Sequence, residues 1–243
     1  MSRTVIPFTG SAAGTRSRRR PVPLTVVPSP PSRPSEATGG RRRGPRRGDL
    51  REAAILDTMA ELLAERPLSS LSIDELAQGA GISRSTFYFY FDSREAVLRA
   101  LSARLADLVF EVSGSWLRRG DEQPEQALRR AIGNYLDLWH EHGAVLRAIA
   151  NSCAGDPELQ AFWTEVGTRF VAAAAEQIRR ERDAGLALPA PPTATDLALV
   201  LSSMSERVCY GASQGDLSDK ARARLADTLA IAWHRAIYGT PTT

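Results

Sequence analysis

Residues 72–98, "SIDELAQGAGISRSTFYFYFDSREAVL", contain two short helical segments that meet at a glycine. Ser72 and Glu75 have the spacing of a capping box, in which the serine oxygen accepts the amide three residues on and the glutamate reaches back to the serine amide. We therefore expect a helix to begin after Ser72 and to end at Gly81. Ser83 can cap a second helix almost directly afterwards. Two short helices with so short a connection predict a helix-turn-helix.

The second of these helices ends in five consecutive aromatic residues, at 87–91. Phe87 and Phe91 are four residues apart and therefore share one face, which we expect to pack into the core. Tyr88 and Tyr90 are expected on the DNA-facing side, where each hydroxyl is available to a phosphate. The alternative, that all five rings only build a core, stays open at this point.

The first turn of the second helix predicts a surface that reads DNA. A helix-turn-helix inserts its second helix into the major groove with the N-terminal residues first. Here those residues are Arg84, Ser85 and Thr86. An arginine can bond two guanine acceptors at once, and a serine or threonine hydroxyl can bond a base edge or a phosphate.

A strongly basic arm precedes the first predicted helix. The first 48 residues hold eleven arginines and one acidic residue, Glu36, which gives a net charge of +10, whereas the rest of the chain carries −7. The arm is rich in Pro, Gly and Ser without hydrophobic periodicity, so we expect it to be disordered in isolation. Its charge indicates a polyanionic partner, most simply nucleic acid. A solvated tail is one alternative, and a protein that binds DNA or acidic membrane surfaces without sequence preference is another.

Hydrophobic periodicity predicts an all-α chain of about nine helices. The first begins at Asp49 and carries apolar residues such as Ile55 and Met59 on one face. Residues 92–95, "DSRE", repeat the capping-box spacing and are expected to start a long fourth helix. Further helices are expected at 124–140, 143–152, 156–184, 193–212 and 217–238, and no run is convincing as a strand.

Enzymatic, metal-binding and membrane-spanning proteins are not indicated. Cys153 and Cys209 have neither the spacing of a zinc site nor that of a disulfide framework, and the three histidines form no catalytic pattern. No phosphate-binding glycine motif and no run of about 18 apolar residues occur. The arginines at 18–20 precede an apolar run that is too short and too rich in proline for an export signal. We expect no catalysis, no metal, no cofactor and no membrane partner, and a cytoplasmic location.

Aromatic residues recur at helical spacing in the second half of the chain. Tyr135 and Trp139 are four apart, and Trp163 and Phe170 are seven apart, so each pair lies on one helix face. Core packing is the ordinary explanation of such pairs. A ligand pocket is the alternative.

Residues 49–98 resemble the N-terminal domain of TetR-family transcriptional regulators, in which a first helix, a helix-turn-helix ending in Tyr-x-Tyr-Phe and a long fourth helix follow in this order. The segments "ERDAG" at 181–185, "MSER" at 204–207 and "AIYG" at 236–239 extend the similarity to one branch of that family over nearly the whole body. The resemblance implies a sequence-specific, homodimeric transcriptional regulator with a palindromic operator. It further implies repression that is relieved when a small molecule binds the C-terminal domain. Our hypothesis for this relief is that the bound molecule moves the fourth helix.

In that branch of the family, an elongated apolar channel is lined by aromatic and a few polar side chains. The matching positions here are Tyr135, Trp139, Trp163, Phe170, Ser202, Ser205, Glu206, Tyr210 and Trp233. The resemblance therefore implies an elongated hydrophobic ligand with one hydrogen-bonding end. Pairing of Glu206 with Arg207 or with a neighbouring helix is the alternative for that residue. Gly167 and Ala173 leave the length and shape of the channel open.

The chain is thus expected to consist of a disordered basic arm (1–48), a helix-turn-helix DNA-binding domain (49–93) and a ligand-binding and dimerisation domain (94–243). Its candidate DNA-binding residues are Arg84, Ser85, Thr86, Tyr88, Tyr90, Arg94, Arg43, Arg46 and Arg47. The last two helices, with apolar faces that include Leu197, Val200, Leu201 and Leu229, are expected to form a four-helix dimer interface. Packing within one chain is the alternative for these faces.

Overall fold

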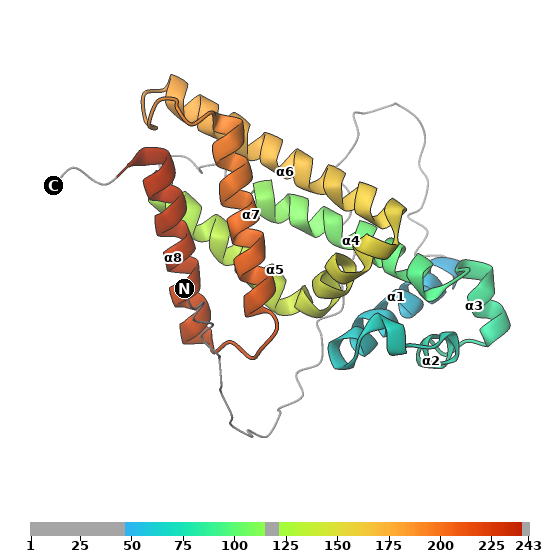
Figure 1. The fold of residues 1–243 in the computed structure, drawn as a ribbon. Helices are drawn as coiled ribbons and strands as arrows, with labels where there is room; N and C mark the ends of the chain where they lie inside the picture. The colour runs from blue at the N-terminus through green and yellow to red at the C-terminus, as the bar shows by residue number, and fades with distance from the viewer. Residues whose placement is uncertain (1–46, 115–121, 240–243) are drawn as a thin grey trace, which may run out of the picture.

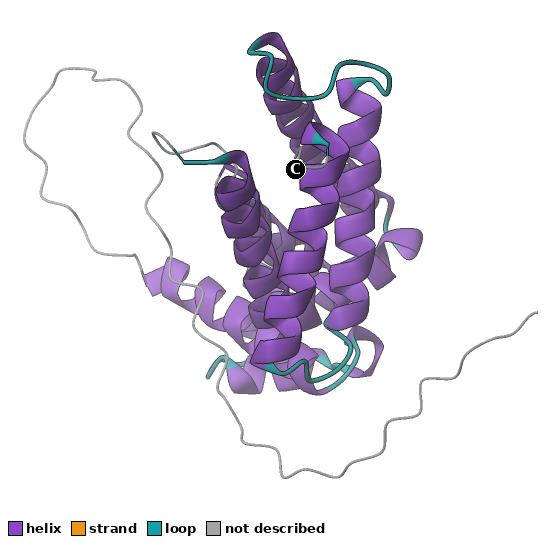
Figure 2. Ribbon diagram, turned by 90° about the vertical axis from the view of Figure 1, so that its left-hand side faces the viewer, coloured by secondary structure: helices purple, strands orange, loops and turns teal. Residues whose placement is uncertain are grey.

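The computed structural model describes residues 47–114 and 122–239, which form eight α-helices and two short 3-10 helices (Figure 1). No strand occurs within these ranges, so the all-α prediction is confirmed (Figure 2). The predicted basic arm lies outside the described residues, apart from its last two positions. The helices are α1 Arg47–Glu65, α2 Ile73–Gly79, α3 Arg84–Tyr90, α4 Arg94–Gly114, α5 Pro124–Ser152, α6 Pro157–Asp183, α7 Ala194–Ala212 and α8 Asp219–Tyr238, with 3-10 helices η1 Leu68–Ser70 and η2 Cys153–Gly155.

The first three helices form a small unit at one end of the molecule, and α4 leads from it into the larger helical body (Figure 1). Ile55 and Met59 of α1, Leu76 of α2 and Phe87 of α3 are fully buried and make its core. Burial of each such side chain contributes about 1.5–3 kcal/mol relative to exposure. This core fixes the angle at which α3 is presented to solvent.

Local signals in the sequence set the ends of α2 and α3 as predicted. The Ser72 hydroxyl accepts the Glu75 amide at 3.3 Å, and the Glu75 carboxylate accepts the Ser72 amide at 2.9 Å, which completes the capping box. Gly81 has a φ of +66°, a conformation that glycine adopts without strain. The Ser83 hydroxyl then accepts the Thr86 amide at 3.1 Å and starts α3.

The predicted capping box at the start of α4 is wrong by one residue. Ser93, not Asp92, caps this helix, because its hydroxyl accepts the amide of Ala96 at 3.1 Å. With Ser93 at the cap, Glu95 is only two positions into the helix and has the wrong spacing to reach back. Its carboxylate accepts a bond from Arg94 Nε at 2.8 Å instead.

The helices predicted at 124–140 and 143–152 are one continuous helix, α5. Gly143, at the start of the second predicted helix, lies inside the observed one. A Cβ atom at Gly143 would lie 2.8 Å from Cβ of Ser213, the residue that ends α7. The glycine therefore allows two helices to approach closely, and it does not mark a break in the chain direction.

The larger body is built around α5, which packs along α8, α4 and α1, while α6 packs along α7. Helices α7 and α8 run side by side at the edge of the body furthest from α1–α3 (Figure 1). Leu197, Leu201 and Leu229, which were predicted to face a second protomer, are buried within the chain. The exposed large apolar residues of these two helices are Leu199, Val200 and Ile231.

Candidate nucleic-acid interface and effector site

Helix α3 divides its aromatic residues between the core and solvent. Phe87 is fully buried and Phe91 is 8% exposed, which confirms their assignment to the packing face. Tyr88 is 45% exposed. The most exposed ring is Phe89, at 83%. Sequence reasoning did not select Phe89, although its position between the two tyrosines places it opposite the buried pair.

Tyr90 lies where the end of α3 meets the beginning of α1. It is half-buried, and its ring packs edge-on against Phe89 with a centroid distance of 5.2 Å. A Cβ atom at Gly48 would lie 3.9 Å from the Tyr90 hydroxyl. The chain that carries the basic arm therefore enters α1 beside the exposed side of α3. Arg47 opens α1, whereas Arg43 and Arg46 lie outside the described residues.

Arg84 is held at the surface by two neighbours. Its guanidinium donates to the Asp74 carboxylate at 2.7 Å and to the Tyr88 hydroxyl at 3.3 Å, and the bond to Tyr88 and then the ion pair raise the pKa of Arg84. Both partners of the ion pair are more than half exposed. Because exposed ion pairs contribute at most about 1 kcal/mol, Arg84 can exchange Asp74 for another anionic partner at small cost.

The hydroxyls at the start of α3 form one group around the cap. The Ser83 oxygen lies 2.9 Å from the Ser85 hydroxyl and 2.8 Å from the Thr86 hydroxyl. Each hydroxyl has two acceptor lone pairs and one proton, so these contacts leave further bonding capacity. Ser85 is exposed and Thr86 is half-buried. The structure thus places Arg84 and Ser85 on the same exposed turn.

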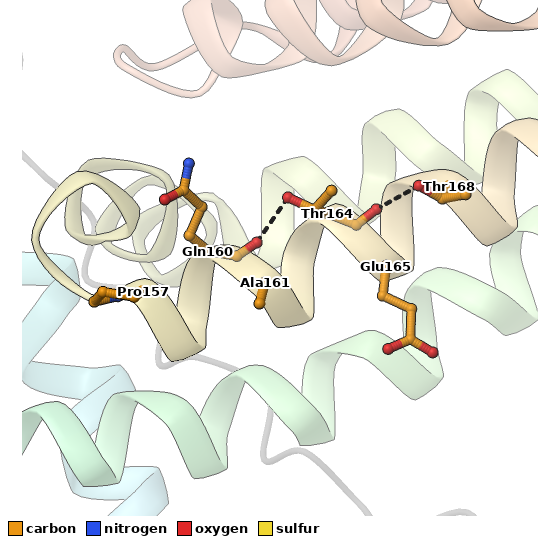
Figure 3. Close-up of a pocket in the computed structure, with 6 residues that line it drawn as sticks. All are labelled: Pro157, Gln160, Ala161, Thr164, Glu165 and Thr168. Atoms are coloured by element: carbon orange, nitrogen blue, oxygen red, sulfur yellow. Dashed lines mark hydrogen bonds between the residues drawn. The ribbon is translucent and has the colours of Figure 1, made fainter.

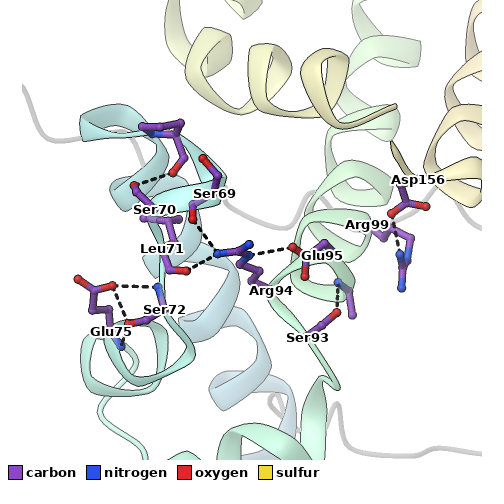
Figure 4. Close-up of polar contacts among 12 residues, drawn as sticks. Ser69, Ser70, Leu71, Ser72, Glu75, Ser93, Arg94, Glu95, Arg99 and Asp156 are labelled. Carbon is purple, nitrogen blue, oxygen red and sulfur yellow. Dashed lines mark hydrogen bonds and ion pairs between the residues drawn. The ribbon is translucent and has the colours of Figure 1, made fainter. Parts of the chain in front are cut away.

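Arg94, also predicted to contact DNA, is engaged within the protein. Its guanidinium donates to the carbonyl oxygens of Ser69 at 3.0 Å and Leu71 at 2.8 Å, and to the Glu95 carboxylate (Figure 4). These bonds connect the turn before α2 to the first turn of α4. Such a position favours a structural role that fixes α4 relative to the unit formed by α1–α3.

Four of the predicted ligand-binding aromatic residues form a continuous row through three helices. The ring of Phe170 on α6 stacks on Tyr135 of α5 with centroids 6.4 Å apart. Tyr135 meets Trp139 edge-on at 6.5 Å, and Trp139 meets Tyr210 of α7 edge-on at 6.3 Å. The Tyr210 hydroxyl closes the row by donating to Asn151 Oδ1 at 2.9 Å. We call these four residues the aromatic row.

Ser205 and Trp233 lie deeper and are bonded to each other. The Trp233 indole donates to the Ser205 hydroxyl at 2.9 Å, and that hydroxyl donates to the Leu201 carbonyl at 2.9 Å. Both residues are buried. Because each polar atom has a partner within the protein, this pair joins α7 to α8 without needing a ligand.

Two other predicted ligand-binding residues carry buried polar atoms that have no hydrogen-bond partner within residues 47–114 and 122–239. These atoms are the indole Nε1 of Trp163 and the hydroxyl oxygen of Ser202. A buried polar group without a partner costs about 1–3 kcal/mol, so such groups are rare in a finished core. They are the groups that a bound ligand can satisfy.

Glu206 makes no hydrogen bond or ion pair in the part of the chain that the structure describes. Arg207, the alternative partner, instead lies over the ring of Tyr210 with a guanidinium-to-centroid distance of 5.5 Å. Glu206 is exposed, yet the surrounding protein desolvates its carboxyl and raises its pKa. Burial, together with the nearby Glu206 charge, also raises the pKa of the Cys209 thiol to about 12.

Sequence models of two known families match these two parts of the chain. The family described as bacterial regulatory proteins, tetR family, matches residues 55–101, and the C-terminal domain of the transcriptional regulator EthR matches residues 128–239. The chain is 39% identical over 203 residues to the HTH-type transcriptional regulator EthR of Mycobacterium tuberculosis, covering 82% of this chain and 93% of that one. The chain belongs to the TetR family.

Two further relatives support this assignment at different distances. The EthR regulator of Mycolicibacterium smegmatis is 38% identical over 83% of this TetR-family chain and 92% of its own length. The HTH-type transcriptional repressor LfrR of the same species is 31% identical over 61% of this chain and 72% of its own. As a TetR-family member, the protein is a sequence-specific DNA-binding transcriptional regulator.

Solved TetR-family structures share the fold. PfmR from Thermus thermophilus superimposes with a TM-score of 0.62 at 20% identity, covering 74% of this chain and 97% of that one. A TetR-family regulator from Streptomyces coelicolor gives a TM-score of 0.61 at 20% identity, covering 76% of this chain and 79% of that one. At this identity the comparison establishes the arrangement of helices alone.

A shallow depression on the outer face of α6 is separate from the predicted ligand-binding residues of this TetR-family chain (Figure 3). It encloses about 510 Å³ and is lined by Pro157, Gln160, Ala161, Thr164, Glu165 and Thr168. The hydroxyls of Thr164 and Thr168 are bonded to carbonyl oxygens of the same helix at 2.8 Å. The depression is open and contains none of the unpartnered polar atoms described above.

The described part of the TetR-family chain contains no group of three metal-ligating side chains and no helix long and apolar enough to span a bilayer. The matched relatives are named as regulators and not as enzymes. Within residues 47–114 and 122–239, the chemistry therefore concentrates at two places, the exposed side of α3 and the aromatic row.

Proposed function

We propose that the protein is a homodimeric, cytoplasmic repressor that binds a palindromic operator and leaves it when an elongated apolar ligand binds beside the aromatic row. Two observations carry this proposal: the buried Trp163 Nε1 and Ser202 Oγ, which have no hydrogen-bond partner among the described residues, and the continuous apolar wall that the aromatic row supplies. Ligand sites typically combine such walls with a few polar groups that fix the orientation of the ligand.

The DNA-binding part of the proposal rests on the exposed turn of α3. Arg84 and Ser85 are exposed there, and Tyr88 and Phe89 extend the exposed surface toward the start of α1. Arg43, Arg46 and Arg47 would add phosphate contacts on the same side, because the chain enters α1 beside Tyr90. Ser85 and Thr86 would bond base edges or phosphates at the edge of the major groove.

The dimer would form through α7 and α8. Leu199 and Val200 on α7 and Ile231 on α8 are exposed large apolar residues on neighbouring helices. Pairing two copies of this surface about a twofold axis gives a four-helix interface, and it places two α3 helices on one side of the DNA. The palindromic operator follows from that symmetry.

Release of DNA requires that the ligand bind better to a conformation in which the two α3 helices no longer match successive major grooves. Helix α4 can transmit this change, because it begins in the DNA-binding unit and packs on α5 and α6. Reciprocity then requires that operator DNA weaken ligand binding by the same factor.

The first experiment measures binding of the full chain to DNA from its own upstream intergenic region and to a scrambled duplex of equal length. At about 150 mM salt non-specific binding is weak, so a repressor should prefer the native duplex by a large factor. Arg84→Ala should reduce that preference, whereas the matched control Arg129→Ala, an exposed arginine on α5, should not. Equal, salt-sensitive binding to both duplexes would favour the rival function, non-specific binding by the basic arm.

A further inference from the structure

We propose that the ligand carries a cationic group, a protonated amine or a quaternary ammonium, and that this group binds between the Glu206 carboxylate and the rings of Tyr210 and Trp139. This inference rests on the proposed function, because it names the chemical class of the ligand for the same site. Four observations support it: the face of α7 on which Glu206 lies, its lack of a partner within the described residues, the groups around it, and the geometry of the rings.

Glu206 lies on one stripe of α7 with two groups of the site. Ser202, Glu206 and Tyr210 follow one another at intervals of four residues, so their side chains are neighbours on the helix surface. The Ser202 hydroxyl is buried without a partner in the part of the chain that the structure describes, and the Tyr210 ring contacts Trp139. Glu206 is therefore placed between an unsatisfied hydroxyl and the end of the aromatic row.

No positive charge within the described residues is bonded to Glu206. Arg207, next to it in sequence, is directed over the face of Tyr210. The groups that respond to the Glu206 charge are the phenol of Tyr135 and the thiols of Cys153 and Cys209, whose pKa values it helps to raise. All three are acids that are neutral at pH 7, so these groups supply no counterion.

Glu206 keeps contact with solvent, while enough protein surrounds it that desolvation raises its pKa. A carboxylate in such a place is costly unless a cation neutralises it. A ligand cation would remove this cost, whereas a ligand carboxylate would add repulsion.

The rings beside Glu206 are suited to a cation. Trp139 and Tyr210 meet at an interplanar angle of 73°, and Tyr135 meets Trp139 at 78°. Their faces therefore point in different directions and can contact a rounded cationic group from more than one side. Aromatic faces attract ammonium groups through the negative potential of the ring.

The test compares ten-carbon probes that differ only at one end: decylamine, decyltrimethylammonium, decanol and decanoate. Each is titrated calorimetrically into the full chain, below its micelle-forming concentration. We expect both cations to bind at least about tenfold more tightly than decanol, and decanoate to bind most weakly. Glu206→Gln keeps the shape of the side chain and should bring the affinities of both cations down to that of decanol. Glu165→Gln, in the separate depression on α6, is the matched control.

The outcomes separate this inference from the proposed function. Equal binding of decylamine and decanol, or a cation preference that survives in the Glu206→Gln variant, would overturn the cationic ligand and leave an apolar ligand site in place. Failure of all four probes to bind would contradict the ligand site itself. Circular dichroism of each variant shows whether the fold is retained.

Discussion

Arg99 of α4 donates a hydrogen bond to Asp156 at 2.7 Å, and Asp156 is the residue that caps α6 (Figure 4). The other carboxylate oxygen of Asp156 accepts the amide of Leu159 at 3.1 Å. This backbone bond, together with the bond from Arg99, lowers the pKa of Asp156. One side chain of α4, the helix that begins in the DNA-binding unit, is thereby fixed to the start of the helix that carries Phe170 and Trp163.

The Arg99–Asp156 contact is expected to couple ligand binding to DNA binding. Arg99→Ala should leave the affinity for each partner alone nearly unchanged, but it should reduce the factor by which a ligand weakens operator binding. Substitutions along a coupling route change the coupling free energy by about 0.5–2 kcal/mol, or roughly 2- to 30-fold. The measurement is operator affinity with and without the ten-carbon probe that binds most tightly.

A matched control for this coupling is Arg129→Ala. Arg129 pairs with Asp227 at 3.1 Å and joins α5 to α8, away from α4. The Arg129→Ala variant should leave the factor by which the ligand weakens operator binding at the wild-type value. Loss of coupling in the control, or full coupling in the Arg99→Ala variant, would contradict a specific role of the contact between α4 and α6.

Two glycines of α5 are predicted to respond to alanine with opposite signs. At Gly143 a Cβ atom would lie 2.8 Å from Cβ of Ser213, so alanine must push α5 and the end of α7 apart, at a cost of about 1–3 kcal/mol. At Gly133 nothing lies within 4 Å of the new Cβ. There alanine should stabilise the protein by about 0.5–1 kcal/mol, because glycine is a poor helix former. Urea denaturation of both variants measures the two free energies of unfolding, and equal shifts would show that the close approach is absent in solution.

Gly143 shows what the sequence could and could not predict about the fold. The ends of α2 and α3 follow from Ser72, Glu75, Gly81 and Ser83, because these residues act on their own neighbours. Gly143 also resembled a local break, but its role is set by α7, about seventy positions away in sequence, and no local pattern contains that contact.

The contacts within the candidate sites also fall into those that the sequence could predict and those that it could not. Helical spacing paired Tyr135 with Trp139, but it could not show that Phe170 stacks on Tyr135 from another helix. Nor could it show that Trp233 and Ser205 are hydrogen-bonded to each other. It also could not show that the buried polar atoms of Ser202 and Trp163 have no hydrogen-bond partner among the described residues. Such distinctions depend on where separate helices meet. Phe89 was missed because it lacks the hydroxyl that made the two tyrosines candidates for a phosphate contact.

Glu75 is expected to make the stability of the protein depend on acidic pH. Its bonds with the Ser72 hydroxyl and with Arg66 lower its pKa to about 2, from an ordinary value near 4.5. A group whose pKa is lowered by folding stabilises the folded state above its unfolded pKa, and this contribution disappears as pH falls toward the folded pKa. Between about pH 4.5 and pH 2 the wild type should therefore lose stability from this source.

The variant Glu75→Gln tests this pH dependence, because glutamine can still complete a capping box but carries no charge. Its free energy of unfolding should fall less steeply over the same pH range than that of the wild type. Denaturation at several pH values compares the two slopes. Parallel curves would show that the carboxylate of Glu75 is not bonded in solution as it is in the structure.

Phe89 and Phe87 are predicted to separate DNA binding from stability within one helix. Phe89 is 83% exposed on the same helix as Arg84 and Tyr88, so Phe89→Ala removes little packing but takes away an apolar surface that can contact a thymine methyl group or the sugar backbone. Operator affinity should fall while the free energy of unfolding stays within about 0.5 kcal/mol of the wild type.

Phe87 is fully buried in the core of the DNA-binding unit, so Phe87→Ala should cost about 3–5 kcal/mol of stability. Fluorescence anisotropy with labelled operator DNA and urea denaturation measure the two effects. If Phe89→Ala bound the operator as tightly as the wild type, the exposed ring would have no part in the DNA interface, and α3 would read DNA through its first turn alone.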